Sequence, residues 1–259
     1  MALFGWENAI EAAGVTLAAS AATAELGPDL LRVPVGSPAV AWQTPAGTTT
    51  AALTITSPGA LSWAVACLSR TNLTSGATIR LRAGTAASLV SAPTYDSGTI
   101  PAGVAIGIGQ ALHILPSAVS AAALRIDLSD PTNPDGFLNV PLAFAGPVAG
   151  ASIAPDSDMG LDVRQADTTT RTGVVFTDPL SRARGWQFRL AATREEDLAW
   201  LDAFEAAAAA RRNVLFVPRA EYTRASAETV FGLLTPGRRS FSTATGARRR
   251  WSATIIERL

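Results

Sequence analysis

Three aspartates and one asparagine stand close together in residues 125–146, RIDLSDPTNPDGFLNVPLAFAG. They are Asp127, Asp130, Asn133 and Asp135. Their side-chain oxygen atoms are of the kind that binds calcium, but their spacing is not that of an EF-hand loop. Each residue type also suits a turn, because Asp130 and Asn133 can cap their own backbone and Gly136 permits a left-handed conformation. We therefore predict a rigid hairpin corner between two strands, not a metal site.

Two further runs carry residue types that are used in cofactor binding or catalysis. Residues 105–112, AIGIGQAL, contain spaced glycines. A phosphate-binding loop needs GxGxxG spacing and a following helix, whereas the next residues, ALHILP, look extended. The acids at residues 195–197 could form a carboxylate pair for glycoside hydrolysis, but they stand where a helix should begin, and acids there favour the helix dipole. We expect neither run to bind a cofactor or to catalyse a reaction.

The chain has one histidine, His113, and one cysteine, Cys67. A Ser-His-Asp site or a multi-histidine zinc site would depend on His113, which sits in a strand-like apolar segment and is expected to be structural. A single cysteine excludes a disulfide within the chain and a multi-thiolate metal site. Cys67 lies in the apolar run LSWAVACL, where a buried, inert thiol is expected. The sequence thus predicts a protein that is not an enzyme, with no catalytic residue, no cofactor and no metal.

Composition limits the partners of the chain. It has 259 residues, 48% of them hydrophobic and 16% charged, with a formal net charge of zero. A nucleic-acid-binding protein would carry a basic excess, so no nucleic acid is expected as a partner. No stretch of about 18 strongly apolar residues occurs, so we expect no membrane span. The N-terminus lacks the basic and apolar regions of a signal peptide, which predicts that the chain is made in the cytoplasm.

The first part of the chain, residues 1–147, has short alternating apolar runs separated by turn residues. They are ALTITS, LSWAVACL, ATIRLRAG, ALHIL and ALRIDLSD. Repeated short strands without a helical pattern between them predict a β-sandwich. In ATIRLRAG we expect Ile79 and Leu81 to point into the core and Arg80 and Arg82 to face water.

Residues 148–160 are rich in glycine, proline and serine, which predicts a linker. In residues 161–259 the pattern becomes α+β: a strand, WQFRLA, one helix, TREEDLAWLDAFEAAAAARRN, and three strands, NVLFVP, TVFGLLTP and RRRWSATIIERL. Thr193 and Glu196 form a capping box at the start of this helix. We expect Leu198, Leu201, Phe204 and Ala208 to form its apolar stripe. The net charge changes sign as well, from −3 before residue 148 to +3 after it. The predicted protein is mainly β, with two domains.

The corner at residues 125–146 resembles a segment of tail proteins from long-tailed bacteriophages and related gene transfer particles. The matching residues are Arg125, Ile126, Asp130, Asn133, Pro134, Asp135, Gly136, Phe137, Phe144 and Gly146. This chain has Val140 and Pro141 where that group tends to have Ile-Gly. The first domain also resembles a galactose-binding-like jelly roll through Pro28, Leu30, Leu31, Trp42, Asn72 and residues 77–81. Residues 161–259 are similar to the tail-tube-like folds of distal tail proteins.

The resemblance implies a structural component of a virion tail, placed at the distal tail, tail tip or baseplate. Its partners would be other tail and baseplate proteins and further copies of itself in a ring. We expect the last strand to be an edge that pairs with another chain and contacts it through Arg248, Arg249, Arg250 and Trp251. Arginine-rich edges of this kind suit an acidic partner.

The alternative is that the jelly roll is a working carbohydrate-binding module, which recognises a host surface glycan during attachment. Such sites use exposed aromatic side chains, and Trp6 and Tyr95 are the candidates, whereas Trp42 and Trp63 are expected in the core. A glycan hydrolase is a distant third interpretation.

Overall fold

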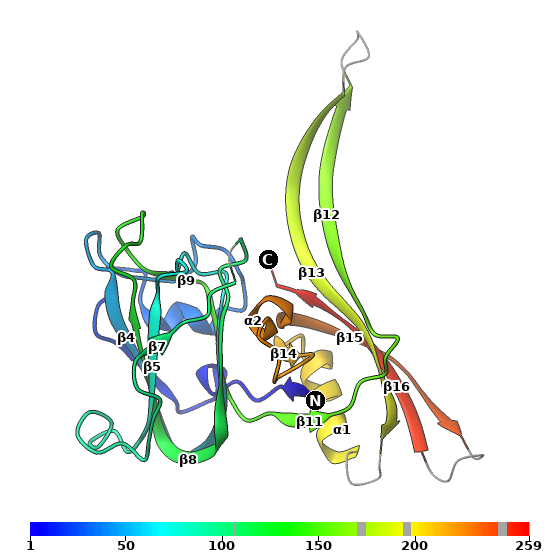
Figure 1. Cartoon of the computed structure of the whole chain (residues 1–259), viewed down its shortest axis with the longest axis horizontal. Helices are drawn as coiled ribbons and strands as arrows, with labels where there is room; N and C mark the ends of the chain where they lie inside the picture. The colour runs from blue at the N-terminus through cyan, green and yellow to red at the C-terminus, as the bar shows by residue number, and fades with distance from the viewer. Residues whose placement is uncertain (106, 170–174, 194–197, 243–247, 259) are drawn as a thin grey trace.

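The structure is a computed structural model that describes residues 1–105, 107–169, 175–193, 198–242 and 248–258. Within these ranges the side chains of residues 162–181, 191–193, 198, 238, 240–242 and 248–250 are not described. The protein is mainly β and has two halves that lie side by side, a sandwich and a barrel, with a long two-stranded ribbon rising from the barrel (Figure 1). No helix in the described parts of the chain is long and apolar enough to cross a membrane.

The sandwich is organised by two long bent strands that run through both of its layers. Its strands are β2 (Thr16–Ala19), β4 (Thr50–Ser69), β5 (Thr78–Gly84), β6 (Tyr95–Asp96), β7 (Ile100–Pro101), β8 (Ala111–Ser129) and β10 (Leu142–Gly146). β4 and β8 pair antiparallel over most of their length, with register shifts near the middle. β2 and β5 flank the outer half of this pair, and β10 flanks the other half. ALTITS and LSWAVACL, which we expected as two strands, are thus one bent strand, and the same holds for ALHIL and ALRIDLSD.

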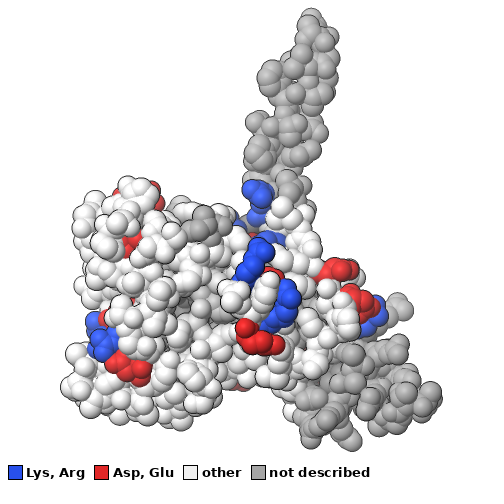
Figure 2. Space-filling view, viewed as in Figure 1, with Lys and Arg blue, Asp and Glu red and all other residues white. Residues whose placement is uncertain are grey.

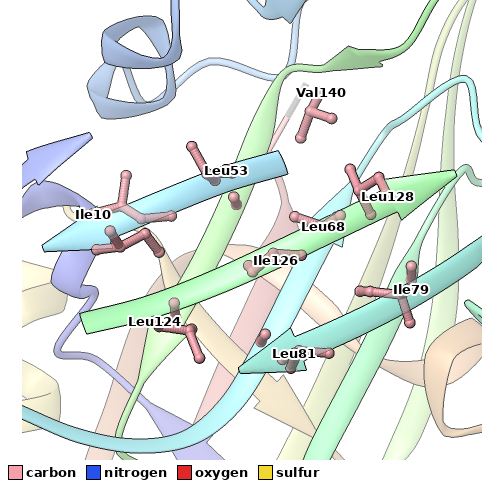
Figure 3. Packing of buried hydrophobic residues seen from close by; sticks show 14 of the residues in the cluster. Ile10, Leu53, Leu68, Ile79, Leu81, Leu124, Ile126, Leu128 and Val140 are labelled. Carbon is pink, nitrogen blue, oxygen red and sulfur yellow. The ribbon is translucent and has the colours of Figure 1, made fainter. Parts of the chain in front are cut away.

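The sandwich core lies between these layers. Leu53, Leu68 and Leu124 meet in it with less than 2% of each side chain exposed (Figure 3). Trp42 and Trp63 are buried as predicted. The small pair β3 (Trp42–Gln43) and β9 (Asn139–Val140) and the 3-10 helices at Ala9–Glu11 and Pro28–Arg32 complete this half.

The strand β5 confirms part of the predicted alternation. Ile79 and Leu81 are buried, and Arg80 is partly exposed. Arg82 was expected to face water, but it is only 7% exposed. Its guanidinium donates to Asp127 on the neighbouring strand β8, and this pairing allows an arginine to remain buried.

The second half is a sheet of seven strands that curls into a barrel. In spatial order these are β11 (Ala149–Ala151), β1 (Ala2–Gly5), β14 (Val214–Val217), β15 (Val230–Ser242), β16 (Arg248–Glu257), β13 (Val175–Thr193) and β12 (Asp158–Thr169). The segment after β11 returns to β13, where Ile153 bridges Leu190 and the N–H of Ala154 donates to the carbonyl of Arg189 at 2.7 Å. That contact closes the sheet.

Helix α1 (Leu198–Ala209) packs against the inner face of this barrel, and the four-residue helix α2 (Ala225–Glu228) joins β14 to β15. Leu201 and Phe204 are buried, as the predicted apolar stripe requires. Phe204 meets Phe4 and Trp251 edge-on, and Phe188 stacks on Phe216 with the ring centroids 4.3 Å apart. The acids at residues 195–197, and with them Glu196 of the predicted capping box, lie outside the described residues.

The predicted domain boundaries need correction, because β1 belongs to the barrel. It pairs with β14 on one side and with β11 on the other. The sandwich is therefore inserted between β1 and β11. Two crossings, the chain segments that follow β1 and precede β11, attach it to the barrel. The predicted linker at residues 148–160 is ordered, since it contains β11 and the first residues of β12. At the crossings the two chain segments touch: a Cβ on Gly146 would lie 2.2 Å from the carbonyl oxygen of Glu7.

A continuous apolar cluster joins the two halves. We call it the interdomain cluster: Leu3, Val65, Cys67, Leu142, Phe144, Leu215, Val217, Ala225 and Phe231. It arises from alternation, because successive residues of a strand point to opposite faces. In β10, Leu142 and Phe144 enter this cluster while Ala143 and Ala145 enter the sandwich core. In β14, Leu215 enters it while Phe216 enters the barrel core. The two halves therefore share buried surface and are not joined as independent domains.

The ribbon is the outer part of the β12–β13 pair. β16 pairs with β13 only from Gly185 to Thr193. Beyond this point β12 and β13 pair with each other alone, from Leu161 opposite Arg184 to Thr169 opposite Val175. At about 3.3 Å per residue this two-stranded part extends roughly 30 Å from the barrel. No third strand pairs with it among the described residues.

Candidate functional site

The aspartate-rich corner is held together by its own hydrogen bonds. Asp130 is fully buried and accepts from the backbone N–H of Thr74 at 2.8 Å, from the Thr74 hydroxyl at 2.7 Å and from Nδ2 of Asn133 at 3.2 Å. Asp135 accepts from Nδ2 of Asn72, and Gly136 has a φ of 70°. The turn roles of Asn133 and Gly136 are thus confirmed, since Oδ1 of Asn133 accepts from the backbone N–H of Asp135 at 3.0 Å. Asp130 does not cap its own backbone, because its carboxylate accepts from Thr74 and Asn133 instead. The hairpin is not: the strands on either side, β8 and β10, lie on opposite sides of β4 and do not pair with each other.

We predict that Asp130→Ala lowers the free energy of unfolding by about 2–3 kcal/mol, because it removes the acceptor of two partly buried donors of Thr74 and leaves Asn133 only the carbonyl of Asn72. Urea unfolding followed by far-ultraviolet circular dichroism measures the change. Asp135→Ala is the control, since its bond to Asn72 is exposed, and should cost under about 1 kcal/mol. A calcium-dependent rise in melting temperature that Asp130→Ala abolishes would contradict the structural role.

The predicted interface at the last strand needs correction. β16 is not an edge, because β15 pairs with one side of it and β13 with the other. Trp251 is 1% exposed, and its Nε1 donates to Glu205 of α1. It is a barrel core residue. The side chains of Arg248, Arg249 and Arg250 lie outside the described part of the structure. The open edge of the sheet is β12, on the ribbon.

The two candidate glycan residues lie far apart in the fold and both have partners. Trp6 is partly buried against α1, where its ring stacks on Trp200 with the centroids 6.1 Å apart. Tyr95 packs against the sandwich core, and its hydroxyl is 3.2 Å from Nε2 of His113. Burial lowers the pKa of His113. The structure does not bring Trp6 and Tyr95 together into one aromatic platform.

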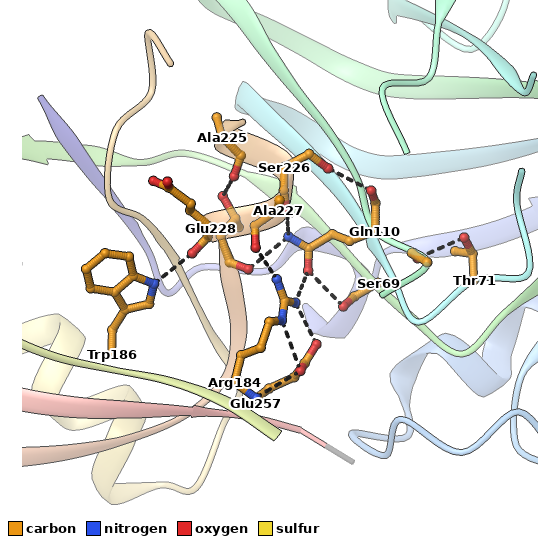
Figure 4. Close-up of polar contacts among 12 residues, drawn as sticks. Ser69, Thr71, Gln110, Arg184, Trp186, Ala225, Ser226, Ala227, Glu228 and Glu257 are labelled. Carbon is orange, nitrogen blue, oxygen red and sulfur yellow. Dashed lines mark hydrogen bonds and ion pairs between the residues drawn. The ribbon is translucent and has the colours of Figure 1, made fainter. Parts of the chain in front are cut away.

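A buried polar network crosses between the two halves beside the interdomain cluster (Figure 4). Its centre is Gln110, which lies immediately before the sandwich strand β8 and is fully buried. Nε2 of Gln110 donates to the carbonyls of Ser226 and Thr229, and its Oε1 accepts from Nη2 of Arg184 at 2.9 Å. Arg184 also forms a bidentate pair with Glu257, at 2.6 and 3.2 Å. Every member of this network is hydrogen-bonded, so it fixes the orientation of the sandwich on the barrel.

Next to this network a groove of about 690 Å³ lies at the foot of the ribbon. From the sandwich it is lined by Pro38, Arg70 and Ile108, and from β12 and β13 by Met159, Leu161 and Arg182. In the space-filling view, basic side chains lie at the foot of the ribbon, and basic and acidic side chains lie together between the two halves (Figure 2). Met159 and Leu161 are 43% and 51% exposed. The groove thus combines apolar walls with positive charge.

Sequence reasoning missed the residues of this groove and network. Gln110 directly follows the spaced glycines of residues 105–109, and the sequence pattern predicts only the extended segment after it, which is part of β8. Arg184 and Glu257 are 73 residues apart in the chain, so no local pattern pairs them.

Cys67 lies in the interdomain cluster, fully buried, and burial raises the pKa of its thiol to about 12. The prediction of a buried thiol is confirmed. Since the ordinary value is 9.0, the neutral thiol contributes stability that is complete below about pH 9 and is lost as the pH rises toward 12.

We therefore expect iodoacetamide to leave Cys67 unmodified in the native protein and to label it on unfolding. Mass spectrometry of the intact chain measures the labelling. Urea unfolding should also show an alkaline loss of stability that Cys67→Ala reduces. Rapid labelling under native conditions would contradict the buried position.

Comparisons with known proteins concern only part of the chain. No protein-family model and no curated protein matches the sequence. Among solved structures, it is similar to a GH29 fucosidase from Ruminococcus gnavus in complex with fucose, with 14% identity and a TM-score of 0.41, over 55% of this chain and 27% of the fucosidase. The chain therefore matches about a quarter of that enzyme's length.

Two further solved structures are binding modules matched over nearly their whole length. The lectin domain of lectinolysin complexed with Lewis B antigen has 10% identity and a TM-score of 0.41, over 55% of this chain and 98% of that one. The family 32 carbohydrate-binding module of Clostridium perfringens NanJ, in complex with galactose, has 14% identity and a TM-score of 0.40, over 56% of this chain and 98% of that one. At these identities none of the three assigns a ligand or an activity to this chain.

Proposed function

We propose that this protein is a structural subunit that assembles with copies of itself and with other proteins into the distal tail or baseplate of a bacteriophage-like particle. The observation that carries the proposal is the ribbon. A two-stranded ribbon alone is marginally stable in water, and its unpaired edges are templates for pairing with another chain. A ribbon that extends roughly 30 Å from a barrel is therefore best explained by a neighbour that covers it.

The particle itself is suggested by the resemblance of residues 125–146 and 161–259 to tail proteins. The joined sandwich and barrel support a building role as well, because a subunit in a ring must present its surfaces in a fixed relation. The interdomain cluster and the network around Gln110 supply that fixed relation.

Shortening the ribbon tests the assembly. Val163 and Arg182 are cross-strand partners, so a two-residue Asn-Gly turn can join them in place of residues 164–181. We expect the full chain to form oligomers in sedimentation velocity experiments and the shortened chain to be a folded monomer. A full chain that stays monomeric at the highest concentration reached would contradict the assembly, and a cryo-electron reconstruction of particles without this protein would contradict the tail.

Sugar recognition by the sandwich is the second candidate function. It is favoured by a second groove, of about 490 Å³, between the loops at residues 71–75 and 107–109. Loops carried by a rigid scaffold are common places for binding sites. However, Asn72 and Thr74 in this groove already hydrogen-bond Asp135 and Asp130. A glycan array probed with the full chain and with Ser75→Tyr, which would fill the groove, decides the matter: binding that the substitution removes supports this function, and no binding excludes it.

A further inference from the structure

We infer that the groove at the foot of the ribbon binds an extended, acidic segment of a partner protein, which pairs with the free edge of β12. The inference uses the proposed function only in that a partner exists. The assembly proposal concerns the outer, two-stranded part of the ribbon. The groove is a different surface, because residues of both halves line it.

The charge of the groove gives the first argument. Neither Arg70 nor Arg182 forms a hydrogen bond or an ion pair with another described residue, while Arg184 and Glu257 neutralise each other. Two arginines without a partner among the described residues, beside an apolar wall, favour carboxylates, which a guanidinium can bind through two parallel hydrogen bonds. The acidic part of the segment should therefore lie toward Arg70 and Arg182.

The backbone conformation of Arg70 and its packing against Gly36 restrict the positions of its side chain. It has a φ of 61°, in the left-handed region. Its side chain crosses Gly36 so closely that a Cβ there would lie 2.6 Å from Cδ of Arg70. The stem of Arg70 is thus packed against the backbone of the sandwich loop, so that less rotamer entropy is lost when the guanidinium binds.

The shape of the groove gives the second argument. Met159 and Leu161 of β12 line it, and no described strand pairs with the outer edge of β12. An added strand would receive main-chain hydrogen bonds from that edge, while its apolar side chains would cover Met159, Leu161 and Ile108. A volume of about 690 Å³ lies within the range of grooves that accept ligands of drug size, and so suits a short segment.

The test uses the full chain and a fluorescently labelled peptide, Asp-Leu-Asp-Val-Glu-Leu, followed by fluorescence anisotropy. Two controls share its length: the same peptide with lysine at each acidic position, and an acidic peptide with methylated backbone nitrogens. We expect the acidic peptide to bind more tightly than both controls and to lose affinity as salt is added.

Matched substitutions locate the site. Arg70 and Arg211 both have positive φ, of 61° and 55°, and asparagine tolerates that conformation. Arg70→Asn should weaken binding of the acidic peptide about tenfold or more, because a hydrogen-bonded charge is lost. Arg211→Asn, at the end of α1, should leave the affinity unchanged. Arg182→Asn should repeat the effect of Arg70→Asn.

Several results would overturn the inference. They are equal affinity for the acidic and lysine peptides, equal effects of Arg70→Asn and Arg211→Asn, or tighter, arginine-dependent binding of a single-stranded oligonucleotide. Self-association that Arg70→Asn disperses and the peptide does not compete with would assign the groove to a second copy of the chain instead. The shortened-ribbon experiment measures oligomer formation and the anisotropy experiment measures peptide affinity. The chain can therefore fail to assemble and still bind the peptide, or assemble without binding it.

Discussion

Replacing Glu257 by alanine is expected to lower the free energy of unfolding by about 3–5 kcal/mol, since it leaves a buried arginine without its counter-charge. Arg184 and Glu257 have side chains only 6% and 4% exposed, and the pair is bidentate. After the substitution Arg184 would keep only the oxygen atoms of Gln110 and Ala227 as acceptors. Urea unfolding at neutral pH measures the loss.

Two controls separate the buried pair from charge in general. Asp156→Ala removes a partner of Arg189 in a pair that is more than half exposed, and should change stability by under about 1 kcal/mol. The double variant Arg184→Leu/Glu257→Leu removes both charges together and should be more stable than Glu257→Ala alone. If Glu257→Ala and Asp156→Ala have equal effects, the network does not join the halves as described.

The second large effect is expected at the interdomain cluster. Phe144 is fully buried and meets Phe231 edge-on, with the ring centroids 5.8 Å apart. Phe144→Ala should lower the free energy of unfolding by about 3–5 kcal/mol through lost burial and a cavity. It should also loosen the contact between the two halves, so that iodoacetamide labels Cys67 in conditions where most molecules are still folded.

Phe188→Ala is the matched control, because Phe188 is equally buried but belongs to the barrel core. It should cost a similar amount of stability, about 3–5 kcal/mol, while labelling of Cys67 follows only global unfolding. The comparison is made at urea concentrations where both variants have the same fraction unfolded. Equal labelling of the two variants there would mean that the halves do not separate on their own.

Local patterns predicted the strands and the long helix well where one face of the element is apolar. The alternating residues of ATIRLRAG placed Ile79 and Leu81 correctly, and the stripe of α1 placed Leu201 and Phe204 correctly. The same patterns could not reveal that β4 and β8 are single bent strands, because the bend lies in a run of small and turn-forming residues that reads as a break between two strands.

The predicted domain boundary was wrong for a different reason. A first strand of four residues, Ala2–Gly5, carries no sign of a partner more than 140 residues away, and only the pairing of Leu3 with Gly150 and Val217 reveals it. The prediction that Arg82 faces water was wrong for a similar reason. Charge alternation placed Arg82 in water, but Asp127 on the adjacent strand permits its burial. The groove and the network combine residues from both halves, so they could be found only in the folded chain.

The double attachment of the sandwich has a mechanical consequence. The two crossings leave from β1 and β11, which are hydrogen-bonded neighbours with Phe4 opposite Ala149. A single connecting segment would let the sandwich rotate relative to the barrel, and the segment would extend before any force reached the barrel. Here a load on the sandwich reaches two paired strands of the barrel at once, and the interdomain cluster resists rotation about them. A force applied to the outer loops of the sandwich would therefore reach both β1 and β11, in the same sheet that carries the ribbon.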